Sequence, residues 1–201
     1  MIKVYAIAAV VAAIAGLSAA WWMGQSTNTA LAQCSATQVT ADIGGPFELV
    51  NPAGETVSEV DVITEPSLVY FGYTFCPDVC PFDVARNADA VDILEEKGLT
   101  VTPVFITIDP KRDTTEVVGD YAENMHDRMI GLTGSDDQVA AASVAYKTYY
   151  KTHDDGTDEY LVDHSTFTYL MMPETGFAEF FRRDVTAEQM AERTACFIEN
   201  S

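Results

Sequence analysis

Basic side chains are scarce in this chain. Its 201 residues include 11 Lys and Arg against 31 Asp and Glu, which gives a formal net charge of −20. This balance argues against nucleic acid or anionic lipid as a partner, since both attract positive charge. The acidic residues are dispersed along the chain, so we interpret them as a solvated surface that can also attract cations or a basic protein face.

Internal repeats and a second domain boundary are also lacking, and only one long apolar run is present, at residues 4–23. About 20 uncharged residues are enough to cross a bilayer as a helix, and Lys3 favours a cytoplasmic N-terminus and an exported domain. The alternative is a signal peptide cleaved near Ala20. We favour an uncleaved anchor, because Trp21 and Trp22 prolong the run and suit a membrane interface.

The predicted domain organisation follows from that run. Residues 1–23 form a transmembrane anchor, and residues 24–40 form a polar linker that holds the domain away from the membrane. Residues 41–201 are enough for one domain with a proper core.

Two of the four cysteines, Cys76 and Cys80, lie four positions apart at the end of an apolar run. Pro77 is tolerated in a first helical turn, so we predict Cys76 near a helix N-terminus and Cys80 one turn further in, on the same face. Such a pair can hold one soft metal ion, oxidise to a disulfide, or be merely structural. The helix dipole is expected to lower the pKa of the first thiol.

The other two cysteines, Cys34 and Cys196, lie near the two ends of the predicted domain. An exported chain permits disulfides, and the ends of compact domains are often close together. We therefore predict a Cys34–Cys196 disulfide. Lipidation of Cys34 is disfavoured, because Gln33 is too large and the apolar run ends well before it.

Strands and helices are predicted to alternate along the domain: a hairpin, three strand–helix units, a second hairpin and a final helix. This order implies a thioredoxin-like α/β fold, a mixed sheet flanked by helices, with the cysteine motif at the C-terminal end of a central strand. The predicted strands are residues 47–50, 56–58, 67–73, 101–108, 129–132, 165–172 and 177–181. The predicted helices are the cysteine helix, which Gly98 ends, and residues 114–125, 136–146 and 186–198. Residues 152–160 are predicted to be a loop.

Only three histidines can supply a further ligand. His126 is predicted at a helix end and His153 in an acidic loop, and neither position requires a metal. His164 precedes a strand that should run beside the cysteine strand, so it should face the cysteine motif. Two thiolates and one imidazole suit copper, as Cu(I) or Cu(II), while zinc would fit the same ligands with water in a fourth position.

Four segments occur in a fixed order: residues 71–81 with the two cysteines, residues 108–114, residues 131–134, and residues 163–165 with the histidine. Together they resemble the Sco/SenC family of copper-binding, thioredoxin-fold proteins. The resemblance extends from about Phe47 to the C-terminus, and the cysteine motif combined with the Asp-His-Ser segment is its most specific part.

The resemblance implies a membrane-tethered copper chaperone that binds one copper through Cys76, Cys80 and His164, with Asp163 orienting the histidine. Such proteins assist assembly of the dinuclear copper centre in subunit II of cytochrome c oxidase, as copper donors, as reductants of that subunit's cysteines, or both. Subunit II is thus the expected partner, and other copper carriers are further candidates. The expected location is the bacterial inner membrane, single-pass, with the soluble domain in the periplasm.

Some features depart from the family pattern. Phe75 stands in a position that is commonly Tyr, residues 63–67 replace a lysine-containing turn, and the second cysteine pair lies outside the site pattern. The thioredoxin-type proline before the last hairpin is absent, which argues against a general disulfide oxidoreductase. A reductase or redox sensor specific to one partner is the alternative function, and a peroxidase of the peroxiredoxin kind is a third.

Overall fold

The computed structural model describes residues 34–35, 42–153, 156–157 and 159–201. The predicted anchor, residues 1–23, and most of the predicted linker lie outside this part of the chain. Within the described part, no helix is both long and apolar enough to cross a membrane. The strands are β1 (Glu48–Val50), β2 (Thr56–Ser58), β3 (Ser67–Gly72), β4 (Thr102–Thr107), β5 (Ile130–Leu132), β6 (Tyr150–Thr152), β7 (Val162–His164), β8 (Thr168–Met172) and β9 (Gly176–Phe181). The helices are α2 (Glu59–Val62), α3 (Val79–Glu96), α4 (Thr115–Met125), α5 (Asp136–Ala145) and α6 (Ala187–Asn200).

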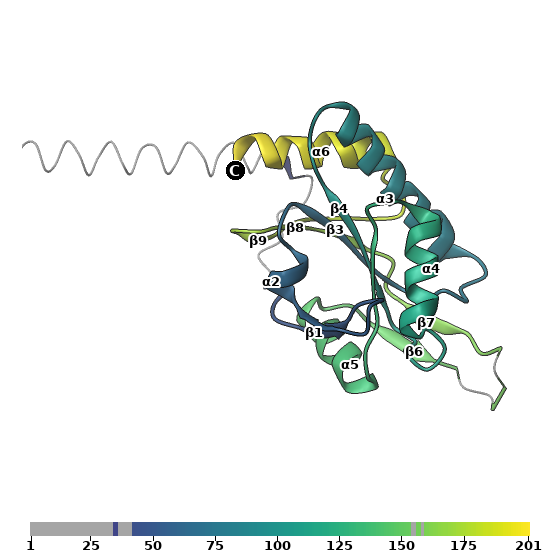
Figure 1. The fold of residues 1–201 in the computed structure, drawn as a ribbon. Coiled ribbons are helices and arrows are strands. Elements are labelled where there is room, and N and C mark those ends of the chain that lie inside the picture. Colours follow the sequence, from purple (N-terminus) through teal and green to yellow (C-terminus); the bar gives the residue numbers. More distant parts are fainter. Residues whose placement is uncertain (1–33, 36–41, 154–155, 158) are drawn as a thin grey trace, which may run out of the picture.

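A five-stranded sheet, in the order β5-β4-β3-β8-β9, forms the centre of the domain (Figure 1). Strands β3, β4 and β5 are parallel, whereas β8 and β9 run antiparallel to their neighbours. Every residue of β3 and β4 is buried, as expected for continuous apolar strands covered on both faces. The predicted mixed α/β sheet of the thioredoxin-like type is therefore confirmed.

Alternate residues of β3 contact different layers of the fold. On one face, Tyr70 hydrogen-bonds to Asp83 of α3, and α3 in turn packs against α6. On the other face, the ring of Phe71 lies 5.2 Å from that of Tyr146, at the end of α5. Because successive side chains of a strand point to opposite faces of the sheet, these contacts place α3 and α5 on opposite sides of it.

Side chains at the helix starts explain why the predicted boundaries are close to the observed ones. Thr114 accepts a hydrogen bond from the Val117 amide at the start of α4. Capping boxes begin α5, at Ser135, and α6, at Thr186. Helix α3 ends before Gly98, whose φ of +77° a residue with a side chain rarely adopts.

The prediction of a loop at residues 152–160 and of a strand from residue 165 is wrong in part. Residues on both sides of the acidic stretch pair as the antiparallel hairpin β6–β7, in which Tyr150 lies opposite His164. Strand β8 begins only at Thr168. The short helix α2 was not predicted either. The three-residue strands β6 and β7 flank a polar, acidic stretch, and α2 is a single turn, so neither carries enough periodicity to be recognised in sequence.

The structure confirms the predicted disulfide between Cys34 and Cys196, whose Cα atoms lie 5.6 Å apart. Cys34 is buried in a cluster of apolar side chains formed by α3, β8 and α6. The bond thus attaches the first described residues to the last helix.

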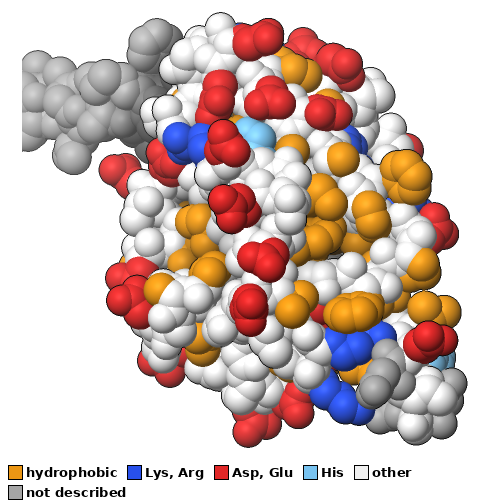
Figure 2. Space-filling view, turned by 45° about the vertical axis from the view of Figure 1, so that its right-hand side comes forward, with side chains coloured by type: hydrophobic (Ala, Val, Ile, Leu, Met, Phe, Trp, Pro, Cys, Tyr) orange, Lys and Arg blue, Asp and Glu red, His pale blue; other side chains and the backbone are white. Residues whose placement is uncertain are grey.

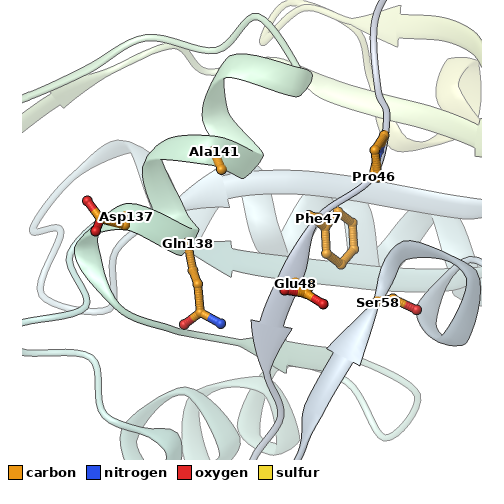
Figure 3. A pocket seen from close by; sticks show the side chains of 7 residues that line it. All are labelled: Pro46, Phe47, Glu48, Ser58, Asp137, Gln138 and Ala141. Atoms are coloured by element: carbon orange, nitrogen blue, oxygen red, sulfur yellow. The ribbon is translucent and has the colours of Figure 1, made fainter.

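One pocket of about 530 Å³ lies between α5 and the β1–β2 hairpin (Figure 3). Phe47 and Ala141 form part of its wall. Gln138 also lines this pocket, but its amide oxygen already accepts a hydrogen bond from the Ser135 N–H, at 2.8 Å, in the capping box of α5. No cysteine or histidine lines this pocket among the described residues, so it is not the candidate site.

Candidate metal centre

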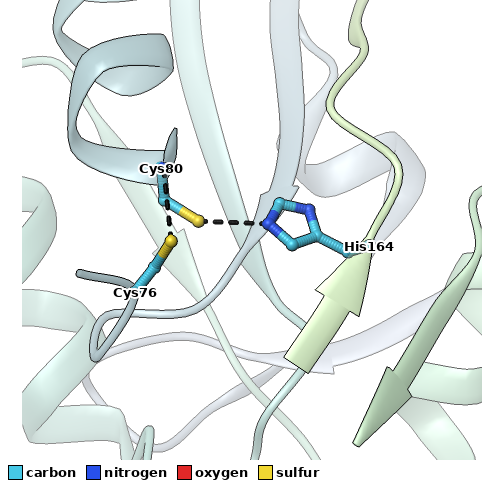
Figure 4. Close-up of side chains that lie close together, drawn as sticks. All are labelled: Cys76, Cys80 and His164. Atoms are coloured by element: carbon cyan, nitrogen blue, oxygen red, sulfur yellow. Dashed lines mark hydrogen bonds between the residues drawn. The ribbon is translucent and has the colours of Figure 1, made fainter. Parts of the chain in front are cut away.

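The loop between β3 and α3 positions both motif cysteines. Helix α3 begins at Val79, so Cys80 lies in its first turn and Cys76 precedes it. The prediction that Pro77 occupies the first helical turn is therefore wrong. The predicted proximity holds nevertheless, because the loop folds back and the Cys80 N–H donates to Cys76 Sγ at 3.4 Å (Figure 4).

A buried carboxylate holds this loop in place. Asp113 accepts hydrogen bonds from the Thr74 amide at 3.0 Å and from the hydroxyls of Thr74 and Thr107 at 2.6 Å each. Burial raises the pKa of Asp113, although these hydrogen bonds oppose that effect. The loop that carries Cys76 is thereby tied to the end of β4.

Gly72, the last residue of β3, is required by close packing at the site. A Cβ atom at this position would lie 2.8 Å from a ring carbon of Tyr70 and 3.2 Å from Cys80 Sγ. The absence of a side chain at residue 72 therefore lets the buried sulfur of Cys80 lie against the strand.

His164, at the end of β7, completes the cluster. Its Nε2 lies 3.3 Å from Cys80 Sγ (Figure 4). The potential ligand atoms of Cys76, Cys80 and His164 all lie within 4.8 Å of one another. The three predicted site residues are thus brought together, although His164 lies on a hairpin outside the central sheet rather than in a loop before β8.

The imidazole of His164 is oriented for coordination through Nε2. Its Nδ1 donates to the Ser165 carbonyl at 2.8 Å, which leaves the Nε2 lone pair directed at Cys80. The rings of Tyr70 and Tyr73 lie edge-on to it, with centroids 6.2 and 6.0 Å away. Burial lowers the pKa of His164, so the ring is neutral at pH 7 and able to act as a ligand.

Asp163 does not orient His164, contrary to the expectation from the resemblance. Its carboxylate contacts His153 Nε2 at 2.6 Å instead. The Ser165 carbonyl takes the orienting role.

The two thiols differ in acidity. Burial alone would raise the pKa of Cys76, but hydrogen bonds from the Cys80 thiol and from three backbone amides outweigh it and lower the pKa. Burial, followed by the contact with Cys76, raises the pKa of Cys80. Both are free thiols, so Cys76 is the more readily formed thiolate, whereas Cys80 retains its proton.

We expect this difference to appear in alkylation of the copper-free reduced protein. Iodoacetamide should modify Cys76 at a rate that reaches its plateau below the usual thiol pKa of about 8.5, whereas Cys80 should react only at higher pH. Mass spectrometry of peptides over a pH series measures both rates. The unfolded protein, in which the two thiols should react alike, is the control, and faster modification of Cys80 in the folded protein would contradict the assignment.

Arg112 connects the cysteine loop to the β6–β7 hairpin. Its guanidinium lies 3.7 Å from the ring centroid of Tyr160 and 5.0 Å from that of Phe75, and it donates to the Tyr160 carbonyl at 2.9 Å. The Tyr160 hydroxyl in turn donates to Asp109 at 2.6 Å. This set of contacts holds the hairpin that carries His164 against the rest of the domain.

The other two histidines are not brought to the cysteines. His126 lies close to Asp92 and Glu95, a grouping that also has ligand atoms within 4.8 Å of one another. Its Nδ1 accepts the Arg128 N–H at 3.0 Å, so the ring proton is on Nε2, 3.3 Å from the Asp92 carboxylate. The lone pair that a metal requires is already used, and we interpret this group as an ion-paired surface.

Several residues that shape the site could not be identified from the sequence. Tyr70, Tyr73, Arg112 and Asp113 contact the ligands or the loops that carry them. Arg112 and Asp113 lie within the conspicuous segment 108–114, and only that position in a motif indicated importance. Their specific contacts depend on the fold.

Comparison with known proteins agrees with this arrangement. Residues 35–199 match the protein family SCO1/SenC. Protein SenC of Rhodobacter capsulatus is 48% identical over 193 residues, which cover 95% of this chain and 87% of that protein. The crystal structure of Arabidopsis thaliana ScoI with copper bound has a TM-score of 0.73 at 37% identity, covering 78% of this chain and 99% of that one. Yeast Sco1 with copper bound has a TM-score of 0.74 at 34% identity, covering 80% and 91%.

Proposed function

Because the chain belongs to the SCO1/SenC family, we propose that it is a membrane-tethered copper chaperone for cytochrome c oxidase. It binds one copper ion, its cargo, through Cys76, Cys80 and His164, and assists assembly of the dinuclear copper centre of subunit II. The observation that carries this proposal is the convergence of two sulfurs and a neutral, correctly oriented imidazole from segments 84 residues apart in sequence.

The donor set supports copper as the cargo. Soft thiolates favour Cu(I), and the added imidazole makes Cu(II) acceptable as well. Relatives 34% and 37% identical have been solved with copper bound. Zinc would use the same ligands with a fourth position open to water, and among the described residues nothing around the cluster resembles the acid–base machinery of a zinc hydrolase.

The shape of the site suits release as well as binding. A pocket of about 460 Å³ is lined by both Cys76 and His164, whereas Cys80 is fully buried. An acceptor thiolate can therefore replace Cys76 or His164 as a copper ligand first, while Cys80 stays bound to the ion until the final ligand exchange.

The alternative activity is reduction of a disulfide in subunit II. The Cys76 thiolate would attack one sulfur of that disulfide and release the other as a thiolate. Cys80 would then lose its proton to solvent and attack Cys76 Sγ, which breaks the mixed disulfide and releases the partner's second sulfur as a thiolate, so that the partner is reduced by two electrons and a Cys76–Cys80 disulfide forms. The lowered pKa of Cys76 favours this candidate.

The anchor and the location are proposals of the same kind. We infer that residues 1–23 hold the protein in the bacterial inner membrane, and that residues 41–201 form the copper-binding domain in the periplasm. The Cys34–Cys196 disulfide supports an oxidising compartment.

The decisive experiment follows copper in the full-length protein reconstituted in vesicles. We expect one copper per chain and its transfer to the reduced, copper-free soluble domain of subunit II, detected by the absorption of the dinuclear centre. Transfer of copper to a fully reduced acceptor would support the chaperone. The reductase would be supported instead if the protein promotes copper uptake by an acceptor that starts as a disulfide but has no effect on an acceptor that starts reduced. Failure of both reactions would reject the proposed function.

A further inference from the structure

Exposed hydrophobic side chains occur in the segments that form the candidate site. Of the six large hydrophobic residues that are exposed in the described part of the chain, three belong to segments that form the pocket: Phe75 (57% exposed), Phe82 (71%) and Leu161 (53%). Soluble proteins seldom expose several such residues around one opening without a function. We call these three residues the site rim.

Each rim residue is placed by an element already described. Phe75 immediately precedes Cys76, and Leu161 lines the pocket itself beside β7. Phe82 lies one turn after Val79, a pocket residue on the same face of α3. In Figure 2, hydrophobic side chains gather on the right-hand part of the face, near the β6–β7 hairpin, whereas Asp and Glu dominate its upper and left-hand parts.

The charged side chains that line the pocket are both acidic, while the cationic Arg112 lies beside the rim, 5.0 Å from the ring centroid of Phe75. Asp78 and Asp163 both line the pocket and are exposed, and no Lys or Arg of the described residues does so. The chain as a whole carries a net charge of −20. This field attracts a positively charged protein over long range and orients it toward the acidic mouth.

We propose that the site rim is the docking surface for the copper acceptor, which meets it with a cysteine-bearing loop that is apolar around the thiols and basic at its margin. The inference rests on the proposed function. Copper passes between thiolates only when they approach within bonding distance, so the acceptor must place a cysteine in the pocket. The neighbouring side chains of the acceptor are then pressed against Phe75, Phe82 and Leu161.

The test compares variants matched in exposure. Phe82→Ser removes the most exposed rim residue, and Val60→Ser, at a position that is 77% exposed in α2, removes an equivalent side chain away from the pocket. The probe is the reduced soluble domain of subunit II, and stopped-flow absorption gives the second-order rate of copper transfer. Removal of a central aromatic contact should slow transfer about 10- to 30-fold. Val60→Ser should match the wild type, and all three proteins should bind one copper.

A second pair of variants tests the charge. Asp78→Asn at the pocket and Glu96→Gln at the far end of α3 change the net charge equally. Asp78 makes no side-chain cap hydrogen bond, so its replacement by asparagine removes no such bond from the start of α3. Only Asp78→Asn should lower the transfer rate at low salt, about 3- to 10-fold, and reduce its dependence on ionic strength.

The outcomes separate the docking surface from the proposed function. If the wild type transfers copper and Phe82→Ser transfers it equally fast, the docking proposal is wrong while the chaperone stands. If Asp78→Asn transfers copper faster than the wild type, the acceptor is not basic, and the proposed basic margin of the acceptor loop is wrong. If the wild type self-associates in sedimentation and Phe82→Ser does not, the rim binds a second copy of this chain and the proposal fails. If the wild type transfers nothing, both proposals fall together.

Discussion

Replacement of His164 by alanine is expected to weaken Cu(II) binding by at least about 100-fold. Removal of groups that merely orient a ligand costs 10- to 100-fold in metal affinity, and removal of the ligand itself should cost more. The remaining pair of thiolates suits Cu(I) but not Cu(II), so Cu(I) affinity should fall much less. Competition titrations with a chelator in each oxidation state measure both affinities, and the loss of an imidazole ligand should also change the visible absorption of the Cu(II) form.

His126→Ala is the matched control for this experiment. The His126 side chain is also largely buried, but it lies with Asp92 and Glu95 rather than with the cysteines. We expect unchanged copper stoichiometry and affinity in this variant, with some loss of stability because its hydrogen bonds with Asp92 and the Arg128 amide are removed. Equal copper binding by His164→Ala and the wild type would show that the imidazole near Cys80 is not a ligand. The copper site would then need another third donor.

Removal of the Cys34–Cys196 disulfide is expected to produce the largest loss of stability. The bond closes a loop of 162 residues, and a cross-link of that length restricts the unfolded chain strongly. The chain-entropy relation gives about 5 kcal/mol at 25 °C as an upper value, and 2–4 kcal/mol is typical. Urea unfolding of the double variant Cys34→Ser/Cys196→Ser should therefore show a lower midpoint and a steeper slope, because the unfolded chain exposes more surface without the cross-link.

Copper binding supplies the control for the disulfide variant. The bond attaches to α6 and to the apolar cluster around it, whereas Cys76, Cys80 and His164 belong to the other cluster or to the β6–β7 hairpin. The folded double variant should therefore bind one copper with the spectrum of the wild type. An unchanged unfolding midpoint would show that the covalent bond does not stabilise the domain.

Much of the fold could be predicted because the central elements carry strong periodic patterns. Strands β3 and β4 are continuous apolar runs, and α4, α5 and α6 begin at threonine or serine caps that the chain displays openly. The disulfide was also predictable, since an exported chain left only one pairing for the cysteines outside the motif. The β6–β7 hairpin was not, because three-residue strands around an acidic stretch carry no pattern that distinguishes them from a loop.

The sequence by itself determined the ligand types, the spacing of the two cysteines and the strand that presents them, since all of these are local properties. The position of His164 before a predicted strand also indicated which histidine approaches the sulfurs, but only the tertiary structure decided which ring nitrogen faces them. It also decided which of the two thiols ionises more easily. The physical reason is that proximity across 84 residues, burial and the direction of a single carbonyl are set by packing between distant segments, which no local pattern of residues records.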